Sequence, residues 1–159
     1  MPKYKAGQAL LDSARVQAFI ATVRSQCRKC NVQFVLADAH EVGGRGKNSL
    51  WGFFQEPTIR TGSLRTRGNA GMLKIATKNI PVSEWIVTLA HEYAHFLQWF
   101  RDDPVYNSDS YLEMEIATER EAFEILKRFE IPINYEAAKR KSKKYIAKVR
   151  REEKELDHE

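Results

Sequence analysis

The chain of 159 residues has few cysteines, few prolines and no apolar run long enough to cross a membrane. A transmembrane helix takes about 20 consecutive apolar residues. The most apolar stretch, residues 85–100, is interrupted by two histidines, a glutamate and a glutamine. The basic first residues are not followed by the apolar segment of a signal peptide. We therefore expect a cytoplasmic protein without a membrane partner.

The two cysteines, Cys27 and Cys30, are too few for a disulfide framework. Their CxxC spacing occurs in metal sites and redox pairs, but the chain has no second pair of this kind. Both fall at the end of an expected helix. We favour the interpretation that they are ordinary thiols in a reducing compartment.

The composition is that of a soluble globular protein, with 43% hydrophobic and 30% charged residues. The length is sufficient for one domain with a hydrophobic core. Because no repeat or change of composition divides the chain, we expect a single domain over residues 1–159. The net charge of +5 permits contact with nucleic acid without requiring it.

The spacing of apolar residues predicts four helices and three strands, separated by glycine-rich connectors at residues 40–48 and 58–71. Their order predicts an α+β fold with the helices on one face of a three-stranded, mostly antiparallel sheet. The expected helices span residues 9–28, 84–100 (after Ser83 as cap), 110–130 and about 134–155, and the expected strands span residues 32–37, 50–54 and 72–77.

The residues that carry chemistry lie in the apolar run, in the motif His91-Glu92-Tyr93-Ala94-His95. Positions four apart share a face of a helix, so His91 and His95 point the same way and can hold one metal ion. Glu92 is turned by one helical step, where it can reach a water molecule at the metal. Burying such groups without partners costs roughly a few kcal/mol each. The HExxH pattern therefore predicts a zinc (Zn2+) site with Glu92 as the general base.

A third ligand is expected from the helix at residues 110–130. A catalytic zinc site takes three protein ligands and leaves one position open. Glu115 and Glu119 lie in the apolar stripe of this helix, whereas its other glutamates point outward. One of the two is the expected ligand, and the other is expected to hydrogen-bond a ligand imidazole. The spacing of the residues does not decide which glutamate binds the metal and which one hydrogen-bonds the imidazole.

HEYAH followed by a glutamate on the next helix resembles the gluzincins, zinc peptidases with two histidines and one glutamate as ligands. The short chain and the three strands before the motif resemble the small single-domain members, including the ImmA/IrrE-like metallopeptidases and phage-encoded relatives. This resemblance implies a zincin-like fold and a zinc-dependent metallopeptidase. It also implies zinc ligands at His91 and His95 and a general base at Glu92.

Residues 118–123 are similar to the E-x-E-A pattern of these small gluzincins, in which the first glutamate binds zinc. The resemblance therefore favours Glu119 as the third ligand, although Phe123 replaces the Asp or Asn that often follows it. At the spacing of the thermolysin-like branch, Glu115 is the ligand and Glu119 supports it.

The implied reaction is hydrolysis of peptide bonds by glutamate-assisted attack of water, with narrow protein specificity and endopeptidase rather than exopeptidase action. Tyr106, Tyr111 and His40 are candidates for stabilising the oxyanion. In the zincins that this chain resembles, extended substrate pairs with the edge strand before the metal helix. Residues 72–77 or residues 50–54 would form that strand.

A basic segment supports a rival interpretation, since residues 139–151 contain no acid. Its cations could contact nucleic-acid phosphates, as in a DNA-linked protease, or simply form the solvated face of a terminal helix. A third interpretation is a non-catalytic metal-binding domain that recognises a partner, against which the presence of Glu92 argues. The candidate contacts to nucleic acid are Lys139, Arg140, Lys143 and Lys144.

Overall fold

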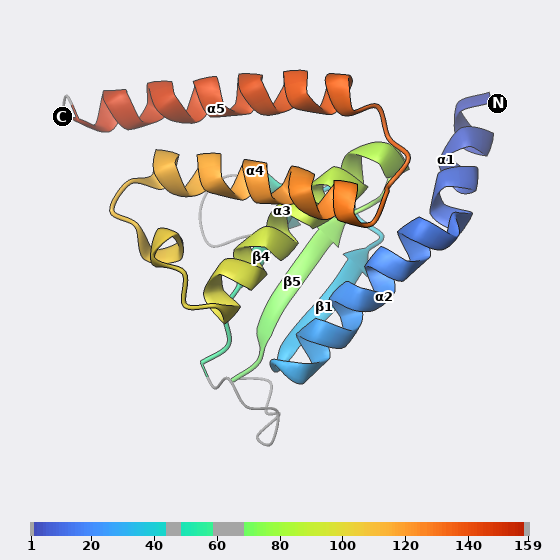
Figure 1. Ribbon diagram of the computed structural model, residues 1–159, viewed down its shortest axis with the longest axis horizontal. Coiled ribbons are helices and arrows are strands. Elements are labelled where there is room, and N and C mark those ends of the chain that lie inside the picture. The colour runs from blue at the N-terminus through green and yellow to red at the C-terminus, as the bar shows by residue number, and fades with distance from the viewer. Residues whose placement is uncertain (1, 44–48, 59–68, 158–159) are drawn as a thin grey trace.

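The computed structural model describes residues 2–43, 49–58 and 69–157 of the chain (Figure 1). Within these residues the fold is α+β, as expected, and mostly helical. The elements are, in chain order, α1 (Pro2–Asp12), α2 (Ala14–Lys29), β1 (Val32–Ala37), β2 (Val42–Gly43), β3 (Ser49–Leu50), β4 (Gly52–Gln55), β5 (Gly71–Ala76), α3 (Val82–Phe100), the 3-10 helix η1 (Pro104–Asn107), α4 (Tyr111–Arg128) and α5 (Tyr135–Asp157).

The main sheet has the strand order β1-β5-β4. β1 runs parallel to β5, with Val32 opposite Gly71, and β4 runs antiparallel to β5, with Gly52 opposite Ile75. The prediction of a mostly antiparallel sheet is therefore wrong, because β5 inserts between two strands that precede it in the chain. For the same reason residues 72–77 do not form an edge strand. They belong to the central strand, and β4 is an edge.

The helices stack on one face of this sheet (Figure 1). Leu73 and Ile75 of β5 are fully buried on that face, where α2 packs on β1 and α3 packs on β4 and β5. α4 then packs on α3, and α5 packs on α4. α3 thus lies between the sheet and α4, and α4 lies between α3 and α5. None of the helices in the described parts of the chain is both long and apolar enough to cross a bilayer.

The first helix begins at Pro2 rather than at the expected residue 9, and two further boundaries differ from the expected ones. The helix expected at residues 9–28 is divided at Ser13, which has a non-helical backbone with φ −58° and ψ 133°. α3 begins directly after Pro81 rather than after Ser83. Ser110 does act as a cap, since its hydroxyl accepts a hydrogen bond from the first turn of α4 at 3.2 Å.

The connector expected at residues 40–48 includes a short strand. β2 pairs antiparallel with β3, with Val42 opposite Leu50. Residues 44–48, and residues 59–68 of the second expected connector, lie outside the described parts of the chain.

The two cysteines are buried, and neither belongs to a disulfide. Burial, together with the neighbouring Cys30, raises the pKa of the Cys27 thiol to about 12. Since the thiolate is the reactive form, Cys27 is inert near neutral pH, and the structure supports the interpretation of ordinary core thiols.

Gly71→Ala should destabilise the fold, because an added methyl group has no room where β5 begins. The new Cβ atom would lie 2.5 Å from the carbonyl oxygen of Gln55 and 2.7 Å from the nitrogen of Pro57, both of which are backbone atoms. Overpacking of this kind costs about 1–3 kcal/mol. Gly43→Ala is the matched control, since nothing lies within 4 Å of its new Cβ. Urea unfolding should show a lower midpoint for Gly71→Ala alone, and equal midpoints would contradict the strand arrangement.

Candidate metal centre

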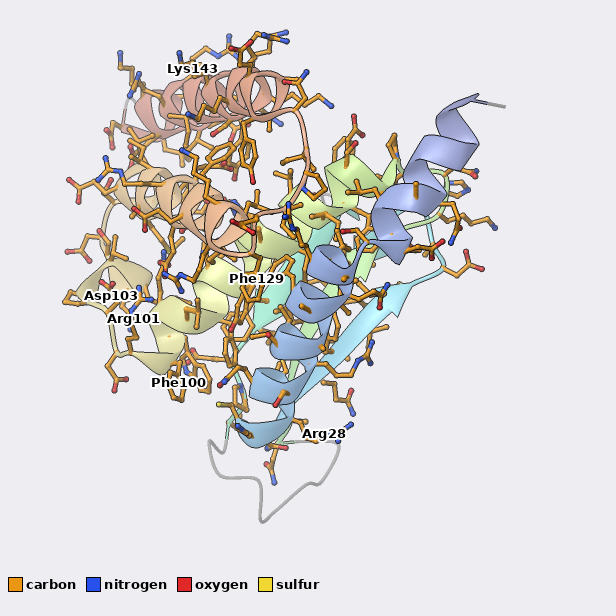
Figure 2. All side chains as sticks on the ribbon, turned by 45° about the vertical axis from the view of Figure 1, so that its right-hand side comes forward. Arg28, Phe100, Arg101, Asp103, Phe129 and Lys143 are labelled. Carbon is orange, nitrogen blue, oxygen red and sulfur yellow. The ribbon has the colours of Figure 1, made fainter. Side chains whose placement is uncertain are left out.

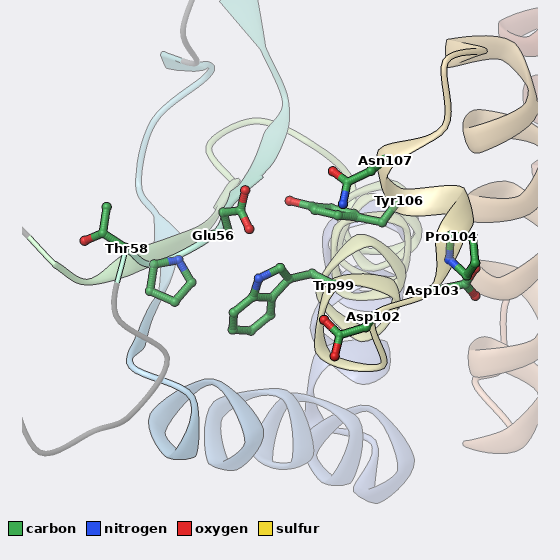
Figure 3. Close-up of a pocket in the computed structure, with 9 residues that line it drawn as sticks. Glu56, Thr58, Trp99, Asp102, Asp103, Pro104, Tyr106 and Asn107 are labelled. Carbon is green, nitrogen blue, oxygen red and sulfur yellow. The ribbon is translucent and has the colours of Figure 1, made fainter.

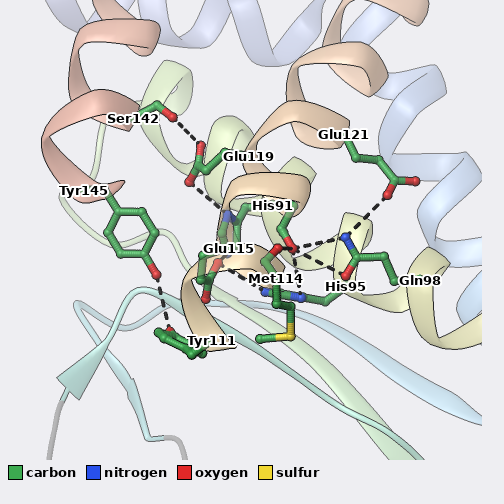
Figure 4. Close-up of polar contacts among 11 residues, drawn as sticks. His91, His95, Gln98, Tyr111, Met114, Glu115, Glu119, Glu121, Ser142 and Tyr145 are labelled. Carbon is green, nitrogen blue, oxygen red and sulfur yellow. Dashed lines mark hydrogen bonds and ion pairs between the residues drawn. The ribbon is translucent and has the colours of Figure 1, made fainter. Parts of the chain in front are cut away.

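Two imidazoles of α3 lie where this helix meets α4 (Figure 4). His91 and His95 are one helical turn apart, and their ring centroids are separated by 4.8 Å. α3 is stable at this place because its sequence is apolar on most sides and lacks Gly and Pro. It is therefore buried both against the sheet and under α4. The prediction that the two histidines share one face of a helix is confirmed.

The third group is Glu115 of α4, whose carboxylate is directed at both rings. Its Oε2 atom lies 3.1 Å from Nε2 of His91 and 3.7 Å from Nε2 of His95. The side chain of Glu115 is 4% exposed, and Oε2 accepts no well-formed hydrogen bond. The donor atoms of the three residues lie within 4.8 Å of one another, which is close enough to hold one metal ion.

Glu119 contacts the opposite edge of the His91 ring. Its Oε1 atom lies 3.1 Å from Nδ1 of His91, and its Oε2 atom accepts a hydrogen bond of 2.8 Å from Ser142 of α5. An ionised carboxylate can only accept hydrogen bonds, so Nδ1 of His91 carries a proton. Whenever the ring is neutral, its Nε2 atom is unprotonated and faces Glu115. The distances thus favour Glu115 at the metal side, the alternative that the resemblance ranked second to Glu119.

His95 is oriented in a similar way by uncharged groups. Oγ1 of Thr118 lies 3.5 Å from Nδ1 of His95 and donates a hydrogen bond of 2.7 Å to the carbonyl of Met114. The side-chain amide of Gln98 donates a hydrogen bond of 3.1 Å to Oγ1 of Thr118. Because the hydroxyl proton is used on Met114, Thr118 accepts from Nδ1–H of His95, and Nε2 is left for Glu115. Thr118 and Gln98 were not among the site residues predicted from the sequence, although both are polar residues within apolar stripes.

The electrostatics of the cluster follow from its burial. Burial opposes charge on His91, but the contacts with Glu115 and Glu119 outweigh this effect and raise its pKa above the usual range. At His95, burial and the neighbouring His91 lower the pKa to about 4. Burial would raise the pKa of Glu115, yet the neighbouring His91 lowers it to about 2. Glu115 is therefore ionised, and it faces a neutral His95.

This arrangement suits a cation. A proton on Nε2 of His91 would satisfy one contact of Glu115, but it would leave the lone pair of His95 directed at the same carboxylate oxygen. A divalent ion among the three atoms would satisfy all of them. The buried Oε2 atom, which has no well-formed hydrogen bond, is therefore a place where such a cation would fit.

Glu92 lies where α3 packs against β4, near enough to His91 and Glu115 for their charges to act on its carboxyl group. A Cβ atom added to Gly52 would meet Cγ of Glu92 at 3.3 Å and the side chain of Thr88 at 2.9 Å. Glycine at position 52 therefore leaves room for the Glu92 side chain beside β4. Burial is the largest effect on the Glu92 carboxyl and raises its pKa to about 7, against the lowering effects of His91 and of a hydrogen bond from the Phe54 backbone. The carboxyl can therefore take up or release a proton near neutral pH.

Two tyrosines lie beside the cluster (Figure 4). The hydroxyl groups of Tyr111, at the start of α4, and Tyr145, on α5, are 3.5 Å apart. The ring of Tyr145 stands edge-on to the ring of His91, with 6.1 Å between centroids. Tyr111 was one of the expected oxyanion stabilisers. Tyr145 was not, because the position of α5 over the site has no signal in the sequence.

The other two candidate stabilisers lie elsewhere. Tyr106 of η1 packs on Phe54 with 6.3 Å between centroids, and its pKa is raised to about 12 by burial, then by Glu56 and Glu92. It therefore lies on the Glu92 side of α3. His40 is exposed and has no described contact with the cluster.

An open cavity of about 520 Å³ lies beyond the end of β4 (Figure 3). Trp99 and Tyr106 line it together with the acidic residues Glu56, Asp102 and Asp103. None of the three metal-facing residues lines this cavity, so it is separate from the cluster.

In comparisons with known proteins, no protein-family model, curated protein or solved structure matches the chain.

Replacing Glu115 and Glu119 by alanine separates the two glutamates. Glu115→Ala removes a metal-facing atom and should abolish most binding of a divalent metal ion. Glu119→Ala leaves three donor atoms and should weaken binding by about 10–100-fold, the usual effect of losing a group that orients a ligand. Metal content by elemental analysis and chelator competition provide the measurement. Retention of metal by Glu115→Ala with loss in Glu119→Ala would reverse the assignment.

Proposed function

We propose that the protein is a zinc-dependent metallopeptidase. The observation that carries this proposal is the convergence of His91, His95 and Glu115 on one point, with Glu92 directed from the same helix toward a sheet edge. The resemblance of HEYAH to the gluzincin motif supports the same conclusion. A purely structural contact between two helices would not require a carboxyl group at Glu92.

The donor set fits zinc. Two imidazoles and one carboxylate form a three-ligand set of the catalytic type, which leaves one coordination position open. Ligand atoms at 2.0–2.2 Å from a tetrahedral ion are roughly 3.3–3.6 Å apart. The separations of 3.1 Å and 3.7 Å between Glu115 and the two imidazole nitrogens lie just below and just above this range, and all three donor atoms lie within 4.8 Å of one another. Zinc, when bound, would polarise a substrate carbonyl and acidify a water molecule.

The residues of the chain supply the remaining functions. Glu92 accepts a proton from the attacking water and returns it to the leaving amine, two transfers that a carboxyl group with a pKa of about 7 performs near neutral pH. Glu119 and Thr118 hold the Nδ1 atoms of the two histidines, so that each Nε2 atom points to the metal position.

The open edge of β4 provides a place for the substrate. The backbone N–H of Ala76 donates to the carbonyl of Trp51 across the β4–β5 ladder. Because antiparallel partners alternate in the direction of their backbone groups, Gly52 and Phe54 direct theirs away from β5. The Phe54 N–H donates to Glu92 there, so the groups open to a substrate are those of Gly52 and the Phe54 carbonyl. An extended peptide could add there as a further strand. Pairing of this kind engages an internal segment of the substrate, which favours an endopeptidase.

A non-catalytic metal-binding domain is the competing function at this site. It would need the two histidines and Glu115 but would place no demand on Glu92. The close approach of α3 to Gly52 supports catalysis instead, because a Cβ atom there would crowd Ile75 and Thr88 at 2.9 Å and Cγ of Glu92 at 3.3 Å.

Glu92→Gln should abolish peptide hydrolysis while leaving zinc content and thermal stability close to those of the wild type. The amide has nearly the same shape but cannot accept the proton of the attacking water. Cleavage of a proteome-derived peptide library, read by mass spectrometry of the new termini, provides the measurement. Glu113→Gln, an exposed position on α4, is the matched control and should cleave normally.

Two results would contradict the proposal. One is cleavage by Glu92→Gln at the rate of the wild type, and the other is a zinc-loaded wild type that produces no new termini in the library.

A further inference from the structure

α5 has an inner face that is occupied by contacts with the rest of the molecule. Val149 is buried, Tyr145 stands against His91, and Ser142 donates to Glu119. Glu153 accepts a hydrogen bond from Ser110 at the start of α4. These residues recur at steps of three or four, so they fix the rotation of the helix about its axis.

The opposite face of α5 is exposed and carries positive charge. Between residues 139 and 151 every exposed residue except Ala147 is a lysine or an arginine. Lys141 pairs with Glu84 and Lys148 with Glu152. The other six cations form no ion pair with any described residue, and together they define the outer cationic face. These six are Lys139, Arg140, Lys143, Lys144, Arg150 and Arg151.

Figure 2 shows α5 at the margin of the molecule, with side chains such as the labelled Lys143 projecting from it. The cationic stretch of thirteen residues, 139–151, is about 18 Å long at 1.5 Å per residue. That length matches about five phosphates of one DNA strand at 3.4 Å spacing. A rigid helix thus holds its cations over a distance comparable to a short segment of duplex.

We propose that the outer cationic face of α5 binds the phosphate backbone of duplex nucleic acid without sequence preference. Duplex is favoured over single strands because the outer face presents no aromatic ring on which a base could stack, Tyr145 being turned inward. A membrane surface is less suitable, because the face has no large apolar residue to enter the lipid. This function goes beyond peptide hydrolysis and does not depend on it.

The test measures binding of the full-length protein to a fluorescently labelled 20-base-pair DNA duplex by anisotropy over a range of salt concentrations. The wild type should bind at 50 mM salt and weaken steeply as salt increases, with equal affinity for unrelated sequences. The triple variant Arg140→Gln, Lys143→Gln, Lys144→Gln should reduce the log–log salt slope by about 2.7, that is about 0.9 for each lost phosphate contact.

The matched control is the triple variant Lys29→Gln, Lys74→Gln, Lys78→Gln, which removes the same charge from positions outside α5. It should keep the wild-type slope, and circular dichroism should show that both triple variants keep their helices. Glu92→Gln should bind like the wild type, which separates this proposal from the peptidase proposal.

Three outcomes would overturn the proposal. They are no binding of the wild type at 50 mM salt, an equal loss of slope in the control triple variant, or tighter binding to anionic lipid vesicles than to duplex. The last outcome would assign the face to a membrane surface instead.

Discussion

The contact on which this structure depends is the one between the Glu115 carboxylate and the two imidazoles of α3. An ionised carboxylate that is 4% exposed costs several kcal/mol unless opposite charge compensates it. The α3–α4 interface is therefore more than hydrophobic packing. It holds α3 and α4 in the relative position in which Glu115 lies beside the Nε2 atoms of both histidines. A metal ion would bind between these three groups.

The surrounding elements hold that position from two directions. On the α4 side, Thr118 accepts from His95 and Glu119 accepts from His91, while Ser142 ties Glu119 to α5. On the sheet side, Gly52 lets α3 approach β4 closely enough for Glu92 to sit beside the strand. α5 thus contributes its inner face to the site, and its outer face remains available for a different partner.

The local structure was largely predictable from the sequence. The strand at residues 32–37 agrees with β1 at both ends, and the long apolar helix and its histidines appear where the pattern placed them. Alternation and helical spacing act over a few residues, so they are readable in one segment at a time. The mixed sheet was not predictable in this way, because the insertion of β5 between β1 and β4 depends on packing between distant segments.

The sequence by itself determined that His91 and His95 face one way, that Glu92 faces another, and that a glutamate of the next helix lies near them. It did not determine which glutamate. Glu115 and Glu119 are four residues apart on the same face of α4, so helical spacing treats them alike. Only the tertiary structure distinguishes them, because the position of α4 along α3 brings Glu115 to the Nε2 atoms, and α5 provides Ser142 as a partner for Glu119.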